Sequence, residues 1–137
     1  FMRNVFKKRE CTEYVLQVIM GKKNLRIIDQ VLQKDYKNLQ GRSAILDCVV
    51  RDADGKQMDV EIQQDNEGAS PKRARYHSGL MDMNTLNPGQ DFDELPESYV
   101  ILLPEMTHWV MDFQFIIYIE RLKKSVRILR MRPILFM

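Results

Sequence analysis

The sequence predicts an α/β fold, and three observations indicate it. Residues 43–64 have the pattern of a β-hairpin, because two runs rich in aliphatic and β-branched residues flank a polar, glycine-containing turn. Apolar residues recur at helical spacing over residues 4–20, and a Ser-Pro pair marks the start of a second helix over residues 71–86. A short apolar run over residues 98–103 has the composition of a buried strand.

The length of the hairpin turn decides which side chains share a face of the sheet. If Asp54-Gly55 were a two-residue loop, both faces would mix polar and apolar side chains. If the loop has three residues and Gly55 is left-handed, Asp47 lies directly opposite Glu61. One face then carries Ala44, Leu46, Cys48 and Val50 against Met58, Val60 and Ile62, and the other carries Ile45, Asp47, Val49 and Arg51 against Gln57, Asp59, Glu61 and Gln63. Because a slip of one residue would bury carboxylates, we expect the second register.

The rest of the chain divides into short elements. Gly21 ends the first helix, whereas residues 24–34 are ambiguous, because their apolar spacing fits a helix and their β-branched content fits a strand. Residues 35–42 are expected to be a polar connection. A further strand is expected over residues 109–119, and the basic and apolar stretch from Glu120 onward fits no clean element. Loops are expected at residues 65–69 and 90–97.

Length and composition favour one soluble domain. A chain of 137 residues has the size of a single domain, here 1–137, and can bury a core without disulfide bonds. Its charged fraction of 29% is near the globular average, and its net charge of +2 neither requires nor excludes nucleic acid as a partner. The two cysteines lack metal-ligand spacing, and Cys48 is expected to be a buried free thiol. Without a signal peptide or an apolar run of about 18 residues, we expect a cytoplasmic protein with no membrane span.

Asp47, Glu61 and Gln63 form a polar cluster that suits a divalent cation. Mg²⁺ prefers oxygen ligands and keeps several waters, so Asp47 and Glu61, with the backbone carbonyl of Ile62, would be sufficient protein ligands. The cation would lower the pKa of a bound water and offset phosphate charge, and the neutral amide of Gln63 could only orient water or substrate. Both acids are expected to face solvent. Paired acids are also common on solvated sheet faces, so these residues alone leave a surface without a metal as an open alternative.

The first turns of the second helix are basic. They carry Lys72, Arg73, Arg75, Tyr76 and His77, of which Arg73, Tyr76 and His77 share one side of the helix. In an arbitrary helix, a solvated basic face would be the usual explanation of this pattern.

Other catalytic chemistries have little support in the sequence. The two histidines, His77 and His108, lie in no nucleophile motif, and neither a G-x-S-x-G motif nor a phosphate-binding loop motif occurs. A zinc site lacks the clustering of histidine and cysteine that it requires.

Four motifs follow one another in the central part of the chain. They are GRS followed by LD within residues 41–47, DGK at 54–56, VEIQ at 60–63 and PKRARY at 71–76. With the later segments NPGQDF and LPESYV, they resemble the PD-(D/E)XK nuclease family of transposase-like proteins, also called recombination-promoting nucleases. The resemblance covers about residues 1–103. Its specific part is an Asp, then a hairpin with Glu-x-Gln, then an Arg-x-x-Tyr helix.

This resemblance implies a fold and an activity. The fold would be a restriction-endonuclease-like αβββαβ core, a mixed sheet flanked by helices, in which residues 24–34 form a strand. The activity would be endonucleolytic cleavage of DNA phosphodiesters that depends on Mg²⁺, with Mn²⁺ as an alternative ion. On the second helix, Arg73 and Tyr76 would contact phosphate or position the acids, and Lys72, Arg73 and Arg75 would supply a local basic patch that holds DNA.

The resemblance also implies roles for individual acids. Asp47 would be the metal-binding aspartate and Glu61 the acid of the (D/E)-x-K motif, while Gln63 stands where many related nucleases have lysine. Many of these nucleases take one more acid from the first helix. Glu10 is preferred to Glu13 for this catalytic role, because it lies nearer the packing edge of that helix.

The chain departs from the family's pattern after residue 103. The family continues with a Gly-containing stretch that leads into a Pro-Ile-Tyr-His-Ile-Glu-Arg-like segment, whereas residues 104–137 contain a Trp-, Met- and Phe-rich string. We hypothesise a reading-frame slip near Glu105, which would make residues 104–137 an atypical or poorly folded tail. The absence of an initial Met agrees with a fragment or a decayed mobile-element gene. The alternative function is therefore a catalytically inactive DNA-binding or protein-interaction remnant, and a homodimer is an arrangement that the sequence leaves open.

Overall fold

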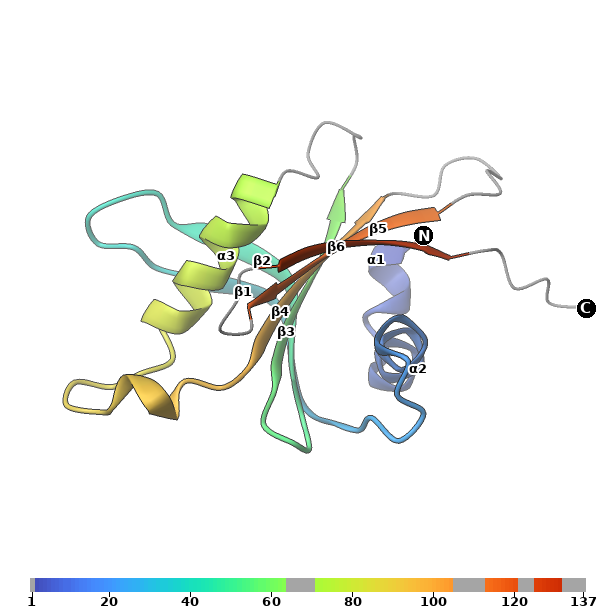
Figure 1. The fold of residues 1–137 in the computed structure, drawn as a ribbon, viewed down its shortest axis with the longest axis horizontal. Helices are drawn as coiled ribbons and strands as arrows, with labels where there is room; N and C mark the ends of the chain where they lie inside the picture. Colours follow the sequence, from blue (N-terminus) through green and yellow to red (C-terminus); the bar gives the residue numbers. More distant parts are fainter. Residues whose placement is uncertain (1, 64–70, 105–112, 121–124, 132–137) are drawn as a thin grey trace, which may run out of the picture.

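The computed structural model describes residues 2–63, 71–104, 113–120 and 125–131, and it forms one mixed β-sheet with helices on both faces (Figure 1). The elements are α1 (Met2–Val5), α2 (Arg9–Met20), β1 (Ile27–Tyr36), β2 (Ala44–Asp52), β3 (Gln57–Gln63), α3 (Pro71–Met83), the 3₁₀ helix η2 (Phe92–Glu94), β4 (Ser98–Pro104), β5 (Phe113–Glu120) and β6 (Ser125–Met131). No helix in these ranges is both long and apolar enough to cross a membrane.

The six described strands lie side by side in the order β1-β2-β3-β4-β5-β6. β3 and β4 are parallel because α3 connects them, and all other neighbouring strands are antiparallel. The succession α2, β1, β2, β3, α3, β4 is the expected αβββαβ core, so the predicted fold class is confirmed. The ambiguous residues 24–34 contribute most of strand β1.

The predicted element boundaries needed several corrections. Residues 35–42 are not all a connection, because β1 continues to Tyr36 before the chain turns into β2. The second predicted helix ends at Met83. After Glu120 the chain does form a regular element, β6, which pairs with β5 along its length. Of the predicted strand over residues 109–119, the first four residues lie outside the described residues and the remainder belongs to β5.

The single helix expected over residues 4–20 is interrupted. Lys8 has an extended backbone, with φ −101° and ψ 116°, and separates α1 from α2. The interruption places the ring of Phe6 in the core, while the Phe6 carbonyl accepts hydrogen bonds from the side chains of Thr12 and Gln30. Gly21 ends α2 in a left-handed conformation, with φ 64°, as expected.

The register of the β2–β3 hairpin is the predicted one. Val49 lies opposite Asp59 and Arg51 opposite Gln57, and Gly55 has a φ of 81° in the turn. A positive φ is accessible to glycine without steric cost, which explains why the turn closes here.

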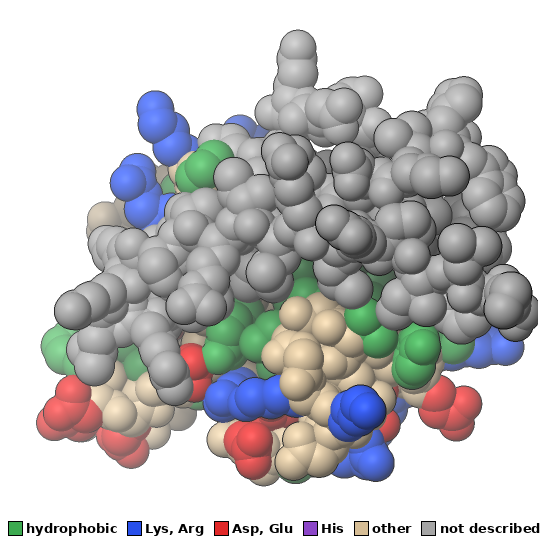
Figure 2. All heavy atoms as spheres, turned by 45° about the vertical axis from the view of Figure 1, so that its right-hand side comes forward, with side chains coloured by type: hydrophobic (Ala, Val, Ile, Leu, Met, Phe, Trp, Pro, Cys, Tyr) green, Lys and Arg blue, Asp and Glu red, His purple; other side chains and the backbone are tan. Residues whose placement is uncertain are grey.

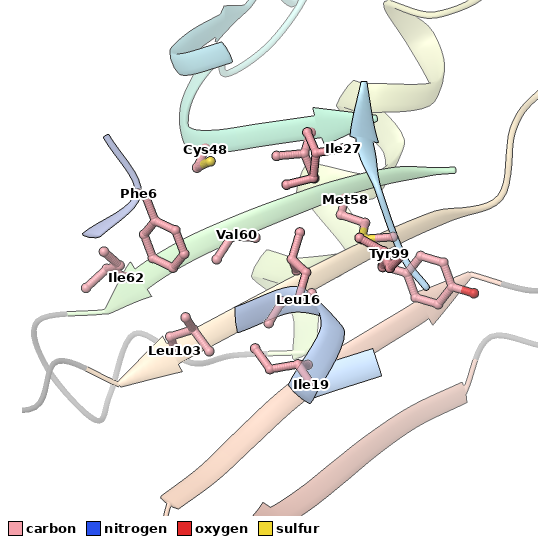
Figure 3. Packing of buried hydrophobic residues seen from close by; sticks show 13 residues of the cluster. Phe6, Leu16, Ile19, Ile27, Cys48, Met58, Val60, Ile62, Tyr99 and Leu103 are labelled. Carbon is pink, nitrogen blue, oxygen red and sulfur yellow. The ribbon is translucent and has the colours of Figure 1, made fainter. Parts of the chain in front are cut away.

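Two apolar clusters cover the two faces of the sheet. On the α2 face, Leu16 and Ile19 pack against alternate residues of β3 and β4, and Phe6 lies beside them (Figure 3). On the α3 face, Leu80 and Met81 of the helix pack against Val100 and Leu102 of β4 and their neighbours. On the side of the molecule turned forward in Figure 2, described basic and acidic side chains are intermixed.

Leu46, Cys48 and Val50 of β2 were predicted to share one face of the sheet, and they do not. Cys48 and Val50 pack in the α2-face cluster, whereas Leu46 belongs to the α3-face cluster. The alternation changes at Asp47, whose backbone N–H donates to a side chain of β3. Opposite Asp47 on β1, Gln33 has a left-handed backbone with φ 52°. Local backbone irregularity in two adjacent strands therefore overrides the simple period of two.

Candidate functional site

Two carboxylates lie where the paired residues of β2 and β3 come to an end. The Asp47 backbone N–H donates to Glu61 Oε1 at 2.8 Å, and the Ile62 backbone N–H donates to Asp47 Oδ2 at 3.1 Å. Each acid therefore accepts a backbone hydrogen bond from the other's strand. These bonds satisfy backbone N–H groups that have no partner in the pairing of β2 with β3. A carboxylate that accepts such a bond is held in one orientation.

The environments of the two acids differ from the expectation that both face solvent. Asp47 is partly buried, but the Glu61 residue is only 2% exposed and lies beneath α3. The reason is the direction of β3: Met58, Val60 and Ile62 point to the α2 face, so Glu61 must point to the α3 face.

A third contact positions Asp47. The Gln33 side-chain amide donates to Asp47 Oδ1 at 2.9 Å, so both carboxylate oxygens of Asp47 have a partner. Gln33 reaches this position from the left-handed backbone conformation on β1. Carboxylate oxygens have more than one lone pair, and they can accept these hydrogen bonds and still bind a cation.

Helix α3 adds a histidine and an arginine to the acids of β3. His77 Nδ1 lies 3.0 Å from Asp59 Oδ2 and 3.9 Å from Glu61 Oε1. One helical turn earlier, Arg73 Nη2 lies 3.7 Å from Glu61 Oε2. Asp59 is 0% exposed and His77 5% exposed, so this group is enclosed between the helix and the sheet. Among the described residues, Asp59 Oδ1 has no hydrogen-bond partner.

Burial controls the protonation of this group. Burial raises the pKa of Asp59 to about 8, with the Asp47 charge adding to the effect and a hydrogen bond with Glu61 opposing it. Burial and the Asp59 charge raise the pKa of Glu61 to about 8. Burial lowers the pKa of His77, against the opposing effect of Glu61. Near neutral pH Asp59 and Glu61 therefore favour their protonated forms, unless a bound cation takes the place of the protons.

The described residues contain donor atoms suited to a divalent cation. One ligand atom each from Asp59, Glu61 and His77 lies within 4.8 Å of the others. The unpartnered oxygen of Asp59 is an independent sign of fit, because a buried carboxylate oxygen without a partner is costly and a bound cation would satisfy it. Asp47 lies next to this group through its backbone bond to Glu61.

The structure does not bring Glu10 to the other acids. It is exposed on α2, and α2 packs on the face of the sheet opposite α3. Glu13, the other acid considered, accepts a hydrogen bond from the Ile27 N–H at 2.9 Å and forms an ion pair with Arg26, so it fastens α2 to the start of β1. Gln63 ends β3, and its side chain lies outside the described residues.

The basic residues predicted to contact DNA lie on α3. Lys72 and Arg75 are exposed at the start of the helix, and Arg73 reaches Glu61 as described. The Tyr76 hydroxyl donates to the Arg42 carbonyl and accepts a hydrogen bond from Asn38. Tyr76 therefore ties the turn between β1 and β2 to α3.

Three residues of this site, Gln33, Asp59 and His77, were not predicted to be site residues. Asp59 has the same strand parity as Glu61, and His77 shares a side of its helix with Arg73, so two signals were present. What was absent was the docking of α3 over this part of β3. Gln33 had no sequence signal, because its contact depends on an unusual backbone angle.

Comparison with known proteins identifies a family. The sequence model of the family described as PD-(D/E)XK nuclease family transposase matches residues 13–127. The match continues past residue 103, where the resemblance recognised in the motifs ends. Neither a curated protein nor a solved structure matches the chain.

Proposed function

Because the chain belongs to the PD-(D/E)XK nuclease family transposases, we propose that it is a metal-dependent DNA endonuclease of the recombination-promoting type. The observation that carries the proposal is the reciprocal bonding of Asp47 and Glu61 at the end of the β2–β3 pairing. Two carboxylates fixed beside each other are suitable ligands for Mg²⁺ or Mn²⁺. When bound, such a cation supplies charge neutralisation at a phosphate and a water of lowered pKa.

Each residue near the two acids has a role that follows from its position. Asp47 and Glu61 hold the cation, with the Ile62 carbonyl as a further oxygen donor on the same strand. Arg73 lies beside Glu61 and is about half exposed, so its guanidinium offsets charge on an approaching phosphate. Gln63, at the end of β3, orients water or substrate as a neutral amide. Glu10 is left out of this group because of its place on α2.

The DNA-binding surface in this proposal is the exposed side of α3. A hollow of about 270 Å³ lies between the helix and the β1–β2 turn, and its lining includes Asn38, Lys72, Arg75 and Tyr76. Basic and hydroxyl groups around a hollow of this kind suit backbone phosphates, which position a duplex without reading its sequence. Contacts limited to this patch are compatible with the net charge of +2.

A protein-interaction function is the second candidate, and the outer strand favours it. β1 is an edge of the described sheet, and apolar side chains near this edge are exposed: Ile28, Val31, Leu32 and Ile45. Unpaired strand edges with apolar side chains favour association, including formation of a homodimer. This function needs no intact acid group, so loss of cleavage with retained self-association would favour it.

Nicking of supercoiled plasmid tests the proposed function. We expect nicking by the purified protein with Mg²⁺ or Mn²⁺, no nicking with EDTA, and a loss of about a hundredfold or more in Asp47→Asn, because one cation ligand is removed. Asp35→Asn is the matched control, since it changes an exposed carboxylate elsewhere on the same sheet. A folded protein that nicks equally with EDTA, or an Asp47→Asn variant with parental activity, would contradict the metal assignment.

A further inference from the structure

We propose that Asp59, Glu61 and His77 form a second cation site, deeper than the Asp47–Glu61 pair, which prefers Mn²⁺ or a similar transition-metal ion to Mg²⁺. The site shares Glu61 with the proposed nuclease centre, but its existence requires neither DNA nor cleavage. It comes from two elements, because β3 provides the carboxylates and α3 provides the imidazole.

The spacing of the donor atoms agrees with ligands around one ion. With bonds of about 2.1 Å, adjacent ligands of an octahedral ion are roughly 3.0 Å apart and opposite ligands roughly 4.2 Å apart. His77 Nδ1 lies 3.0 Å from Asp59 Oδ2 and 3.9 Å from Glu61 Oε1, and one donor from each residue lies within 4.8 Å of the others. Without an ion, His77 Nδ1 and Asp59 Oδ2 are hydrogen-bonded to each other, so a cation would take the place of the proton between them.

Burial gives independent support to the second site. The three residues are at most 5% exposed, and Asp59 Oδ1 has no partner among the described residues. An oxygen that is buried and unpaired normally has a ligand, a water or an ion in the native protein. In the described part of the chain, Arg73 forms an ion pair with Glu61, and its charge also favours the ionised form of Asp59.

The imidazole sets the class of ion. Mg²⁺ prefers oxygen ligands, whereas imidazole nitrogen with carboxylates suits Mn²⁺, Fe²⁺ or Zn²⁺. An ion at the Asp47–Glu61 pair meets only oxygen, so the two positions would differ in preference. The Asp47–Glu61 pair would therefore accept Mg²⁺, whereas the site formed by Asp59, Glu61 and His77 would select a transition-metal ion.

Pulsed EPR on Mn²⁺-loaded protein without DNA tests the assignment directly. With only the histidines labelled with ¹⁵N, we expect a ¹⁵N hyperfine coupling to bound Mn²⁺ in the parent protein, and its loss in His77→Gln. The coupling should persist in His108→Gln, which changes the other histidine of the sequence, and in Asp47→Asn. Asp59→Asn should weaken Mn²⁺ binding about tenfold or more, whereas Asp52→Asn should not, because it changes the buried aspartate that ends β2.

Several results would overturn the proposal. They are bound Mn²⁺ without histidine coupling in the parent protein, no Mn²⁺ binding at all, or a coupling that disappears in His108→Gln. None of these three results depends on whether the His77→Gln variant folds. Plasmid nicking without the coupling would remove only the second site, and the coupling without nicking would remove only the proposed nuclease function.

Discussion

The two faces of strand β3 share one backbone but carry different chemistry. Toward α2, Met58, Val60 and Ile62 enter a cluster of apolar side chains. Toward α3, Asp59 and Glu61 are equally buried, yet they meet a histidine and an arginine. Burial of apolar surface stabilises a fold, whereas burial of ionisable groups costs free energy unless a partner compensates it. The side chains that β3 directs toward α2 therefore stabilise the fold, whereas burial of Asp59 and Glu61 toward α3 costs free energy that we attribute to their proposed function.

Substitutions at two consecutive residues of β3 should have the largest contrasting effects, one on cleavage and the other on stability. Glu61→Gln keeps the side-chain shape and should leave the melting temperature within a few degrees, while plasmid nicking falls about 10³-fold, or ~4 kcal/mol of transition-state stabilisation. Val60→Ala should do the reverse: it lowers the free energy of unfolding by about 2 kcal/mol through lost burial and a cavity, and it leaves the nicking rate of the folded protein nearly unchanged.

Urea unfolding and initial nicking rates measure both variants of this pair. The comparison fails if Val60→Ala loses cleavage at a temperature where it is fully folded. It also fails if Glu61→Gln cleaves like the parent protein.

The buried acids on the α3 face, Asp59 and Glu61, should also make the free energy of unfolding depend on pH. Burial raises the pKa of Asp59 and of Glu61 to about 8 in the folded protein, whereas in the unfolded chain they ionise near their ordinary pKa values of 3.8 and 4.5. The folded state thus binds more protons between these limits, so stability in EDTA should fall as pH rises from about 4 to about 8. Urea unfolding at intervals across this range should show the decline, and Mn²⁺ should oppose it at high pH.

The double variant Asp59→Asn/Glu61→Gln is the control for this pH effect. It removes both titrating groups and should flatten the decline. An equally steep decline in the double variant would assign the effect to other groups.

The contrast between the two faces of β3 also explains which features of the fold and the site could be predicted from the sequence. The β2–β3 register followed from residues 43–64 alone, because only one register sorts apolar from charged side chains. The acids Asp47 and Glu61 could be paired for the same reason. The burial of Glu61 could not be anticipated, since it depends on the docking of α3 over β3, a tertiary contact that the pattern of apolar and polar residues does not encode.

Other features depended on backbone geometry that periodicity does not encode. The interruption at Lys8 follows from placing Phe6 in the core, and helical spacing continues on either side of it. The change of face between Leu46 and Cys48 follows from irregular backbone at Asp47 and Gln33. Tertiary contacts therefore determine the break in the first helix and the change of face in β2. The helix end at Gly21 and the turn at Gly55 follow from local conformational preference, and both were predicted.

The smallest expected effect concerns Gln33, where backbone strain and a site contact coincide. Its left-handed φ of 52° should cost a non-glycine residue about 1 kcal/mol, so Gln33→Gly should unfold at higher urea concentration than Gln33→Ala, by about that free energy. Both variants lose the amide bond to Asp47 Oδ1, so both should weaken the Mg²⁺-induced rise in melting temperature to a similar, modest extent. If the alanine variant were as stable as the glycine variant, the left-handed conformation would not persist in solution. If the glycine variant kept the full response to Mg²⁺, the Gln33 amide would have no role in positioning Asp47, and the backbone bonds between β2 and β3 would suffice to hold the acids.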